Sequence, residues 1–231
     1  MDDEGYLRPI REGGTTNRNQ LVILKNNIEG KIAEFGVFNW INDKLIKNNP
    51  DLSCDSPSDW VGNKNSYDRG YDLFLKKGNF ELPLEVKSSS LFAKSLLLEE
   101  KRWSLNDSLE VINNDHKEIK APFAFISVKV DMNWIENNML DGFKINNKFV
   151  VQDSPKIFIN GVLESKILKK CIEEKTNLFQ KNDIIPTSKS TKLDAPNYIF
   201  PVWSSNLNNL YKMHKPEFGL NVIHRALKKG L

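Results

Sequence analysis

Three ionisable residues, Asp72, Glu85 and Lys87, are of the types that bind divalent metal ions and contact phosphate groups. Residues 71–75 and 80–87 alternate apolar and polar side chains, and the Lys-Lys-Gly-Asn sequence between them is typical of a turn. The pattern predicts a β-hairpin, in which alternate side chains point to opposite faces. The three ionisable residues fall on one face, and the other face is apolar, consisting of Leu73, Leu75, Phe80, Leu82, Leu84 and Val86.

The register of this hairpin determines how close the two carboxylates lie. We expect Leu75 and Phe80 to pair beside the turn, which places Asp72 opposite Pro83 and diagonal to Glu85, with Cβ atoms roughly 7–8 Å apart. Converging carboxylates repel one another unless a cation lies between them. Mg²⁺ suits such a pair because it takes hard oxygen ligands and keeps several of its waters.

Lys87 lies two residues after Glu85 on the same strand, so it is expected to point to the same side. There its ammonium can contact a phosphate group or position an attacking water. The alternative interpretation of this face is an ordinary, solvent-exposed Glu–Lys pair, which carries no chemistry.

A fourth ionisable residue, Glu34, falls inside the apolar stripe of a helix predicted over residues 19–47. It shares the stripe with Phe38, Ile41 and Leu45. A carboxylate withdrawn from water is costly unless it has a partner, and a lysine from the sheet or a metal-bound water would serve. The alternative is a place at the rim of the core in an ordinary salt bridge.

The rest of the chain alternates predicted strands and helices. We expect strands at residues 123–130, 156–162 and 198–203, and helices at residues 164–174 and 217–229. Residues 91–117 are mostly helical in pattern, with a short strand at residues 96–98 as the alternative. Residues 48–70 form a long connection, unless a short strand lies near Trp60.

This order of elements indicates an α/β fold with a central mixed β-sheet flanked by α-helices. Residues 1–18 are expected to form an N-terminal arm, and residues 19–231 a single domain. Within that domain we expect a catalytic core over about residues 19–175 and an α-rich C-terminal extension over about residues 176–231.

Taken together, these residues resemble the PD-(D/E)xK nuclease superfamily, which contains most type II restriction endonucleases. The matching segments are the helix that ends in Glu34, Gly70 to Leu73 at the opening of a strand, and Leu84 to Ser88 on the return strand. The resemblance covers about residues 19–130. Tyr71 replaces the proline of the namesake motif, and Pro83 predicts a bulge or edge-like pairing. Asp68 is an alternative to Asp72 that precedes the alternating run.

The resemblance implies a restriction-endonuclease-like core and a Mg²⁺ cofactor, for which Mn²⁺ can substitute. Asp72, Glu85 and the backbone carbonyl of Val86 would bind the ion, with Glu34 acting through a water or a second metal. Lys87 would orient or help deprotonate the nucleophilic water.

The function implied by the resemblance is a Mg²⁺-dependent DNA endonuclease that hydrolyses phosphodiester bonds. In the leading hypothesis it is a type II restriction enzyme, a homodimer that cuts double-stranded DNA at a specific site and leaves 5′-phosphates. An alternative is a DNA repair, recombination or phage-defence nuclease that reads DNA structure. A non-enzymatic alternative is a nucleic-acid-binding module with an inactive nuclease fold, against which the intact Asp72, Glu85 and Lys87 set counts.

The net charge of +3 permits a nucleic-acid partner without requiring one. Candidate DNA-binding residues are basic and mostly near the C-terminus, although the same residues also fit ordinary solvated helix faces. They are Lys101, Arg102, Lys212, Lys215, Arg225 and Lys228.

The remaining residues of chemical interest are expected to have structural roles. His116, His214 and His224 lack the spacing of zinc ligands, and the tryptophans Trp40, Trp103, Trp134 and Trp203 are expected in packing rather than base stacking. Two distant cysteines, an acidic N-terminus without signal-peptide character and the lack of a long apolar run predict a cytoplasmic protein with no membrane partner.

Overall fold

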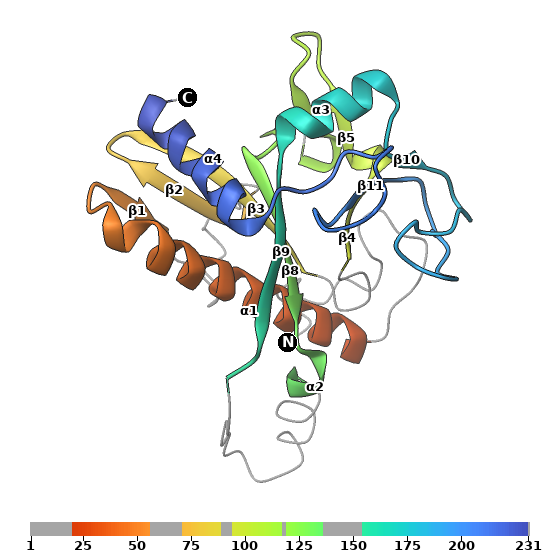
Figure 1. Cartoon of the computed structure of the whole chain (residues 1–231), viewed down its shortest axis with the longest axis horizontal. Coiled ribbons are helices and arrows are strands. Elements are labelled where there is room, and N and C mark those ends of the chain that lie inside the picture. The colour runs from red at the N-terminus through yellow and green to blue at the C-terminus, as the bar shows by residue number, and fades with distance from the viewer. Residues whose placement is uncertain (1–19, 56–70, 89–93, 117–118, 136–153, 231) are drawn as a thin grey trace.

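A computed structural model describes residues 20–55, 71–88, 94–116, 119–135 and 154–230 (Figure 1). The predicted arm at residues 1–18, Asp68 and the region of Trp60 lie outside the described residues. The long connection nevertheless contains a strand that the sequence pattern did not predict, β1, at Leu52–Cys54. It pairs antiparallel with β2 through Leu52 and Lys77.

A five-stranded mixed sheet forms the centre of the fold, in the order β1-β2-β3-β8-β9. Its other strands are β2 at Leu73–Lys77, β3 at Phe80–Ser88, β8 at Ala124–Val130 and β9 at Ile157–Glu164. Strands β3 and β8 are parallel, whereas the other neighbours are antiparallel. The predicted mixed α/β architecture is therefore confirmed.

The β2–β3 hairpin forms as predicted, but its register differs from the predicted one by two residues. Its turn holds only Gly78 and Asn79, so Lys77 pairs with Phe80 and Leu73 with Leu84. Gly78 adopts a φ of 56°, which glycine tolerates without a steric penalty and which tight hairpin turns require. Because side chains alternate with a period of two, a two-residue shift leaves every side chain on its predicted face.

Pro83 does not produce the predicted bulge, because the β2–β3 register runs without interruption past it. Its carbonyl accepts a hydrogen bond from the Phe123 backbone N–H, 2.8 Å away, on the β8 side of the strand. The missing N–H of Pro83 faces that same side, just before the β3–β8 ladder begins at Leu84 and Ala124. The ladder to β2 therefore loses no donor.

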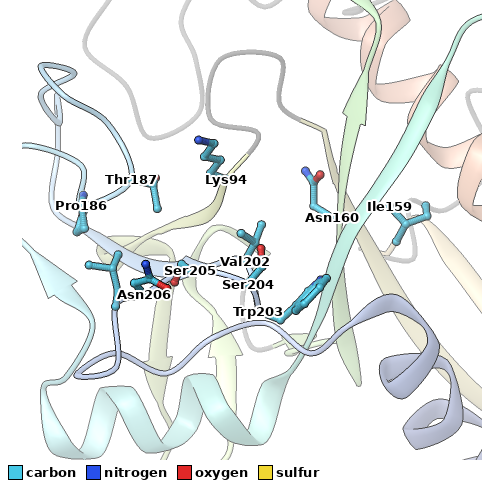
Figure 2. A pocket seen from close by; sticks show the side chains of 11 residues that line it. Lys94, Ile159, Asn160, Pro186, Thr187, Val202, Trp203, Ser204, Ser205 and Asn206 are labelled. Atoms are coloured by element: carbon cyan, nitrogen blue, oxygen red, sulfur yellow. The ribbon is translucent and has the colours of Figure 1, made fainter.

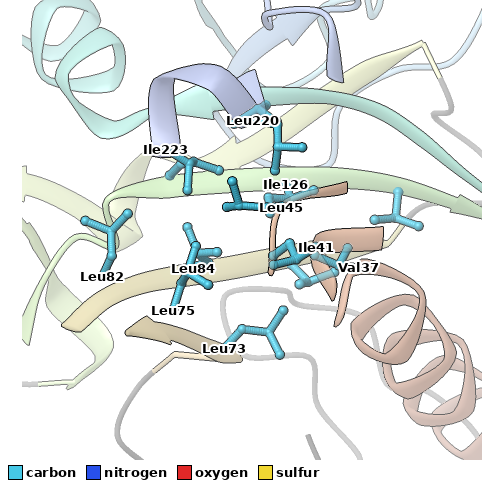
Figure 3. Packing of buried hydrophobic residues seen from close by; sticks show 14 of the residues in the cluster. Val37, Ile41, Leu45, Leu73, Leu75, Leu82, Leu84, Ile126, Leu220 and Ile223 are labelled. Atoms are coloured by element: carbon cyan, nitrogen blue, oxygen red, sulfur yellow. The ribbon is translucent and has the colours of Figure 1, made fainter. Parts of the chain in front are cut away.

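One face of the sheet packs against two helices, α1 at Gln20–Lys44 and α4 at Pro216–Lys229. Leucines of the β2–β3 hairpin lie between the α1 residues and the α4 residues (Figure 3). The labelled members of this core are Val37, Ile41, Leu45, Leu73, Leu75, Leu82, Leu84, Ile126, Leu220 and Ile223. The apolar face predicted for the hairpin is thus the main core.

The opposite face of the sheet packs against a second layer, seen to the right of β9 in Figure 1. Phe125 and Leu163 of the central sheet contribute to this second core. The layer contains α3 at Ser165–Glu174 and a small sheet of β4 at Ser95–Glu99, β10 at Leu178–Phe179 and β11 at Asn197–Pro201.

Two sequence-based expectations are wrong in this layer. The described part of residues 91–117 is not mostly helical, and the alternative of a short strand at residues 96–98 is correct. Leu96 and Leu98 are buried, and β4 pairs with β11, a partner about a hundred residues away that local patterns do not reveal. Residues 176–230 are not α-rich, because they hold β10 and β11 besides the single helix α4.

Short elements complete the described structure. Strands β5 at Trp103–Leu105, β6 at Val111–Asn113 and β7 at Ile119–Lys120 form a third sheet. A four-residue helix, α2, spans Met132–Ile135, and single 3-10 turns lie at Ile46–Asn48, Glu100–Arg102 and Asn114–His116. Within the described residues, no helix is long and apolar enough to cross a membrane.

The close approach of α4 to β9 yields a prediction. A Cβ atom at Gly219 would overlap the side chain of Val162, so Gly219→Ala should overpack this contact and cost about 1–3 kcal/mol. For a domain of this size, each kcal/mol corresponds to a fall in Tm of about 2–4 °C. Thermal unfolding of the purified variant measures the effect.

Gly30→Ala is the matched control, because Gly30 also lies inside a helix but a Cβ there meets nothing within 4 Å. Alanine is a better helix former than glycine, so this variant should gain up to about 1 kcal/mol. Equal effects of the two substitutions would contradict the packing of α4 on Val162.

Candidate active site

Asp72 lies immediately before β2, where the hairpin register continued by one pair would place it opposite Glu85. Its carboxylate oxygen Oδ2 accepts a hydrogen bond of 2.6 Å from the backbone N–H of Val86. If the β2–β3 ladder continued past Leu73, a backbone carbonyl of the β2 side would accept this N–H. The Asp72 carboxylate takes the place of that carbonyl. The two-residue correction to the register brings Asp72 directly opposite Glu85 rather than diagonal to it.

Glu85 and Lys87 point to the same face of β3, as predicted, and their side chains form an ion pair. The Glu85 side chain is 16% exposed and that of Lys87 is 31% exposed, so solvent and a ligand can reach both. The Val86 carbonyl faces the same edge as its N–H, because both groups of one strand residue point to the same neighbour. Carboxylate, carbonyl and ammonium groups therefore meet where β2 begins.

Glu34 of α1 is buried beside Ile41 and Leu45, as its place in the apolar stripe predicted. Its Oε2 atom accepts a 2.6 Å bond from Lys31, one helical turn earlier, and not from a lysine of the sheet. The ordinary salt bridge considered as the alternative is therefore present. Burial raises the pKa of Glu34, and the charge of Glu85 raises it further, whereas Lys31 and Lys87 lower it. Glu34 thus lies within electrostatic range of both β3 residues.

The pKa of Asp72 is raised well above its ordinary value of 3.8. Burial is the largest cause, followed by the negative charge of Glu85, and Glu34 adds to the rise. Lys87 and the Val86 N–H oppose it without cancelling it. Asp72, Glu85 and Glu34, which we call the acidic cluster, therefore carry more negative charge than Lys87 balances. This excess of negative charge favours binding of a cation.

Tyr71 is a positioning residue whose role the sequence did not reveal. Its hydroxyl donates a hydrogen bond to the carbonyl oxygen of Lys120, and its ring meets Phe74 edge-on with centroids 5.6 Å apart. Burial and the charge of Glu85 raise the pKa of the Tyr71 hydroxyl. The residue that replaces proline in the motif thus ties the segment before Asp72 to β7.

Mg²⁺ requires hard oxygen ligands in a near-octahedral arrangement. The described residues contain no group of three or more His, Cys, Asp or Glu side chains that could hold a metal ion. Mg²⁺, however, is commonly bound by only one or two carboxylates and retains several waters. Asp72, Glu85 and the Val86 carbonyl are donors that fit that requirement.

The six basic residues considered as a DNA footprint do not form one patch. Lys101 is exposed, whereas Arg102 is paired with Asp115. Arg225 and Lys228 lie on α4, which covers the face of the sheet opposite to Glu85 and Lys87. These two residues are therefore separated from the acidic cluster by the sheet itself.

Lys212 and Lys215 lie in the loop between β11 and α4. The Lys212 Nζ donates to the carbonyl oxygen of Ser205 at 2.6 Å and to the side chain of Asn208 at 3.0 Å. The Lys215 Nζ lies 4.3 Å from the ring centroid of Trp203. Trp203 is 42% exposed and is not the core or semi-buried residue that was expected, whereas Trp103 is buried as expected.

His214, for which a surface or capping role was expected, is partly buried and contacts a buried carboxylate. Its backbone extends the sheet by pairing with Val162 of β9. Its Nε2 atom lies 3.1 Å from the buried carboxylate of Glu164, whose other oxygen pairs with Lys166 at 2.7 Å. The network joins α3, β9 and the C-terminal loop, and it lies apart from the acidic cluster.

Cys54 and Cys171 are both free thiols.

The raised pKa of Asp72 predicts that Asp72→Asn stabilises the metal-free protein. Asparagine removes the destabilised charge and still offers an oxygen to the Val86 N–H. An acid with a raised pKa costs no stability well below its ordinary value of 3.8, because both states are then protonated. The cost grows as the pH rises from 3.8 to the folded-state pKa and stays at its full value above it. Differential scanning fluorimetry with EDTA should show similar Tm values for the two proteins near pH 4 and a higher Tm for the variant at neutral pH.

Asp51→Asn is the control, because the Asp51 side chain is 60% exposed and pairs with Lys77 on the neighbouring strand. Its substitution should change the free energy of unfolding by less than about 1 kcal/mol at any pH. A lower Tm for Asp72→Asn than for the unsubstituted protein at neutral pH would contradict the electrostatic account of the cluster.

Comparison with known proteins does not assign the chain to a family. No family model, no curated protein and no solved structure matches it. The chemistry of this protein therefore has to be inferred from the residues that the fold brings together around Asp72 and Glu85.

Proposed function

We propose that the protein is a Mg²⁺-dependent nuclease that hydrolyses phosphodiester bonds in DNA. The observation that carries the proposal is the position of Asp72 just before β2, where the Val86 N–H holds it and the hairpin register continued by one pair places it opposite Glu85. Two carboxylates in this arrangement, with Lys87 on the same face, combine metal-binding oxygens with a group that contacts phosphate.

Asp72, Glu85 and the Val86 carbonyl would hold the ion in this proposal. When bound, Mg²⁺ supplies Lewis-acid polarisation of a phosphate oxygen and neutralises negative charge that develops during an in-line displacement. Tyr71 contributes by fixing the backbone that leads into Asp72, through its bond to Lys120. The resemblance to PD-(D/E)xK nucleases supports the same assignment of roles.

Lys87 would act on the phosphate and the attacking water. Its ammonium pairs with Glu85 in the absence of substrate and lies on the exposed face of β3. A phosphate anion beside it offers a second acceptor for the same ammonium, which then holds the water in line with the scissile bond. Attack by the water oxygen breaks the bond to the 3′ oxygen and leaves a 3′-hydroxyl and a 5′-phosphate.

The finer part of the proposal rests on the resemblance alone. We propose that the substrate is double-stranded DNA, that the protein cuts it at a specific site in the manner of a type II restriction enzyme, and that it acts as a homodimer. Discrete fragments from plasmid DNA are the outcome expected of such an enzyme, whereas a nuclease that reads DNA structure cuts junctions or flaps instead.

Cleavage assays on supercoiled plasmid test the proposal. Glu85→Ala removes a metal ligand and Lys87→Ala removes the phosphate contact, so each should lower the cleavage rate at least about 100-fold. EDTA should stop cleavage by the unsubstituted protein, and Mn²⁺ should restore it. Gel electrophoresis of the products over time measures the rates.

Glu81→Ala is the matched control, because Glu81 lies on the same strand and face but pairs with Lys76, at 3.0 Å, near the turn. This variant should cut at the unsubstituted rate. Cleavage that survives either Glu85→Ala or Lys87→Ala, or cleavage that ignores EDTA, would refute the assigned roles.

A further inference from the structure

A pocket of about 580 Å³ lies between β9 and the loop that follows β11 (Figure 2). Volumes of about 300–1,000 Å³ are typical of sites for small ligands. The residues that line it are mostly polar, and among these described residues none is acidic. They include Lys94, Asn160, Trp203 and Ser205.

Asn160 reaches the pocket through an irregularity in β9. Ser127 pairs with Gly161 and Val128 with Ile159, so Asn160 is an extra residue in the ladder, a β-bulge. Ile159 packs on the main core, whereas the Asn160 side chain points the other way, into the pocket (Figure 2). Its Nδ2 atom is buried and finds no hydrogen-bond partner among the described residues.

Ser205 presents a second buried polar atom, since its Oγ also lacks a partner within the described structure. The loop that carries it is fixed, because the Lys212 Nζ holds the Ser205 carbonyl oxygen and the Val202 N–H donates to the Lys94 carbonyl oxygen at 2.9 Å. Native proteins leave few buried polar groups unpaired, and each one calls for an explanation. A polar ligand that pairs with both atoms is such an explanation.

Trp203 adds an aromatic surface to the same pocket. The Lys215 ammonium lies 4.3 Å from its ring centroid, and the indole also lines the pocket. Aromatic rings bind nucleobases by stacking, whatever the base, and a cation on the ring adds a favourable charge for a polyanion. Lys94 supplies a further positive charge to the lining, which suits a nucleotide phosphate.

The pocket opens on the same face of the sheet as the acidic cluster. Lys87 pairs with Ser127, and Ser127 pairs with Gly161, the residue next to Asn160. Two strand spacings, roughly 10 Å, therefore separate the backbone at Lys87 from the bulge. A nucleic-acid strand whose phosphate lies at Lys87 can place a nearby nucleotide in the pocket.

We propose that this pocket is a nucleotide subsite, which takes one nucleobase of the nucleic-acid substrate out of its stack, against Trp203. This inference rests on the proposed nuclease function and deepens it. The buried Asn160 amide donates to an acceptor on the base edge, the Ser205 hydroxyl bonds a second polar atom, and Lys94 contacts the phosphate. The site recognises an unstacked base and not the outside of a regular duplex.

Binding of a fluorescein-labelled DNA oligonucleotide, followed by anisotropy with Ca²⁺ in place of Mg²⁺, tests the subsite without cleavage. Trp203→Ala should weaken binding roughly 5- to 100-fold, the range expected for loss of one stacked base. Asn160→Ala should weaken binding while leaving the Tm unchanged or higher, because it removes an unpaired donor. Phe158→Ala is the control, since Phe158 is an exposed aromatic of β9 outside the lining, and it should bind as the unsubstituted protein does.

A series of oligonucleotides, each with one abasic position, identifies the captured base. The unsubstituted protein should lose affinity at one position, and Trp203→Ala should bind the whole series alike. If Trp203→Ala and Asn160→Ala bind like the control while the unsubstituted protein still cuts DNA, the subsite is overturned and the nuclease function stands. If the unsubstituted protein neither binds nor cuts DNA, both proposals fall.

Discussion

The structure around the β2–β3 hairpin depends on one electrostatic constraint, the placement of the Asp72 carboxylate opposite Glu85. Two contacts offset part of the negative charge of this pair of carboxylates. The Val86 N–H donates to Asp72, and Lys87 pairs with Glu85. The pKa of Asp72 is still well above its ordinary value, because burial and the charge of Glu85 raise it more than Lys87 and the Val86 N–H lower it. A fold that keeps such a contact carries a local cost that binding of a cation would relieve.

The faces of the hairpin could be predicted from the sequence, whereas its register could not. Alternation determines which side each residue takes, and Leu73, Leu84 and Glu85 all obey it. The turn could close over four residues or two, and in the observed register Lys76 pairs with both Asp55 and Glu81. Since Asp55 is distant in sequence, no local pattern predicts that contact.

Long-range contacts also account for the parts of the structure that the sequence pattern missed. The strand β4 forms because β11, about a hundred residues later in the chain, pairs with it. Trp203 is exposed although its neighbour Val202 packs against the second core. The bulge at Asn160 depends on a mismatch between β8 and β9 that neither strand reveals alone. Strands β3, β8 and β9 lie side by side in the central sheet. Lys87 pairs with Ser127 and Ser127 with Gly161, so Lys87 and the pocket beside Asn160 lie on the same face.

A crystal of the protein soaked in Mn²⁺ and measured at the manganese absorption edge tests the central claim most directly. The account predicts an anomalous difference peak about 2.1 Å from oxygen atoms of Asp72, Glu85 and the Val86 carbonyl. A fully soaked crystal with no peak between these groups, or with Asp72 and Glu85 turned to opposite sides of the sheet, would contradict it.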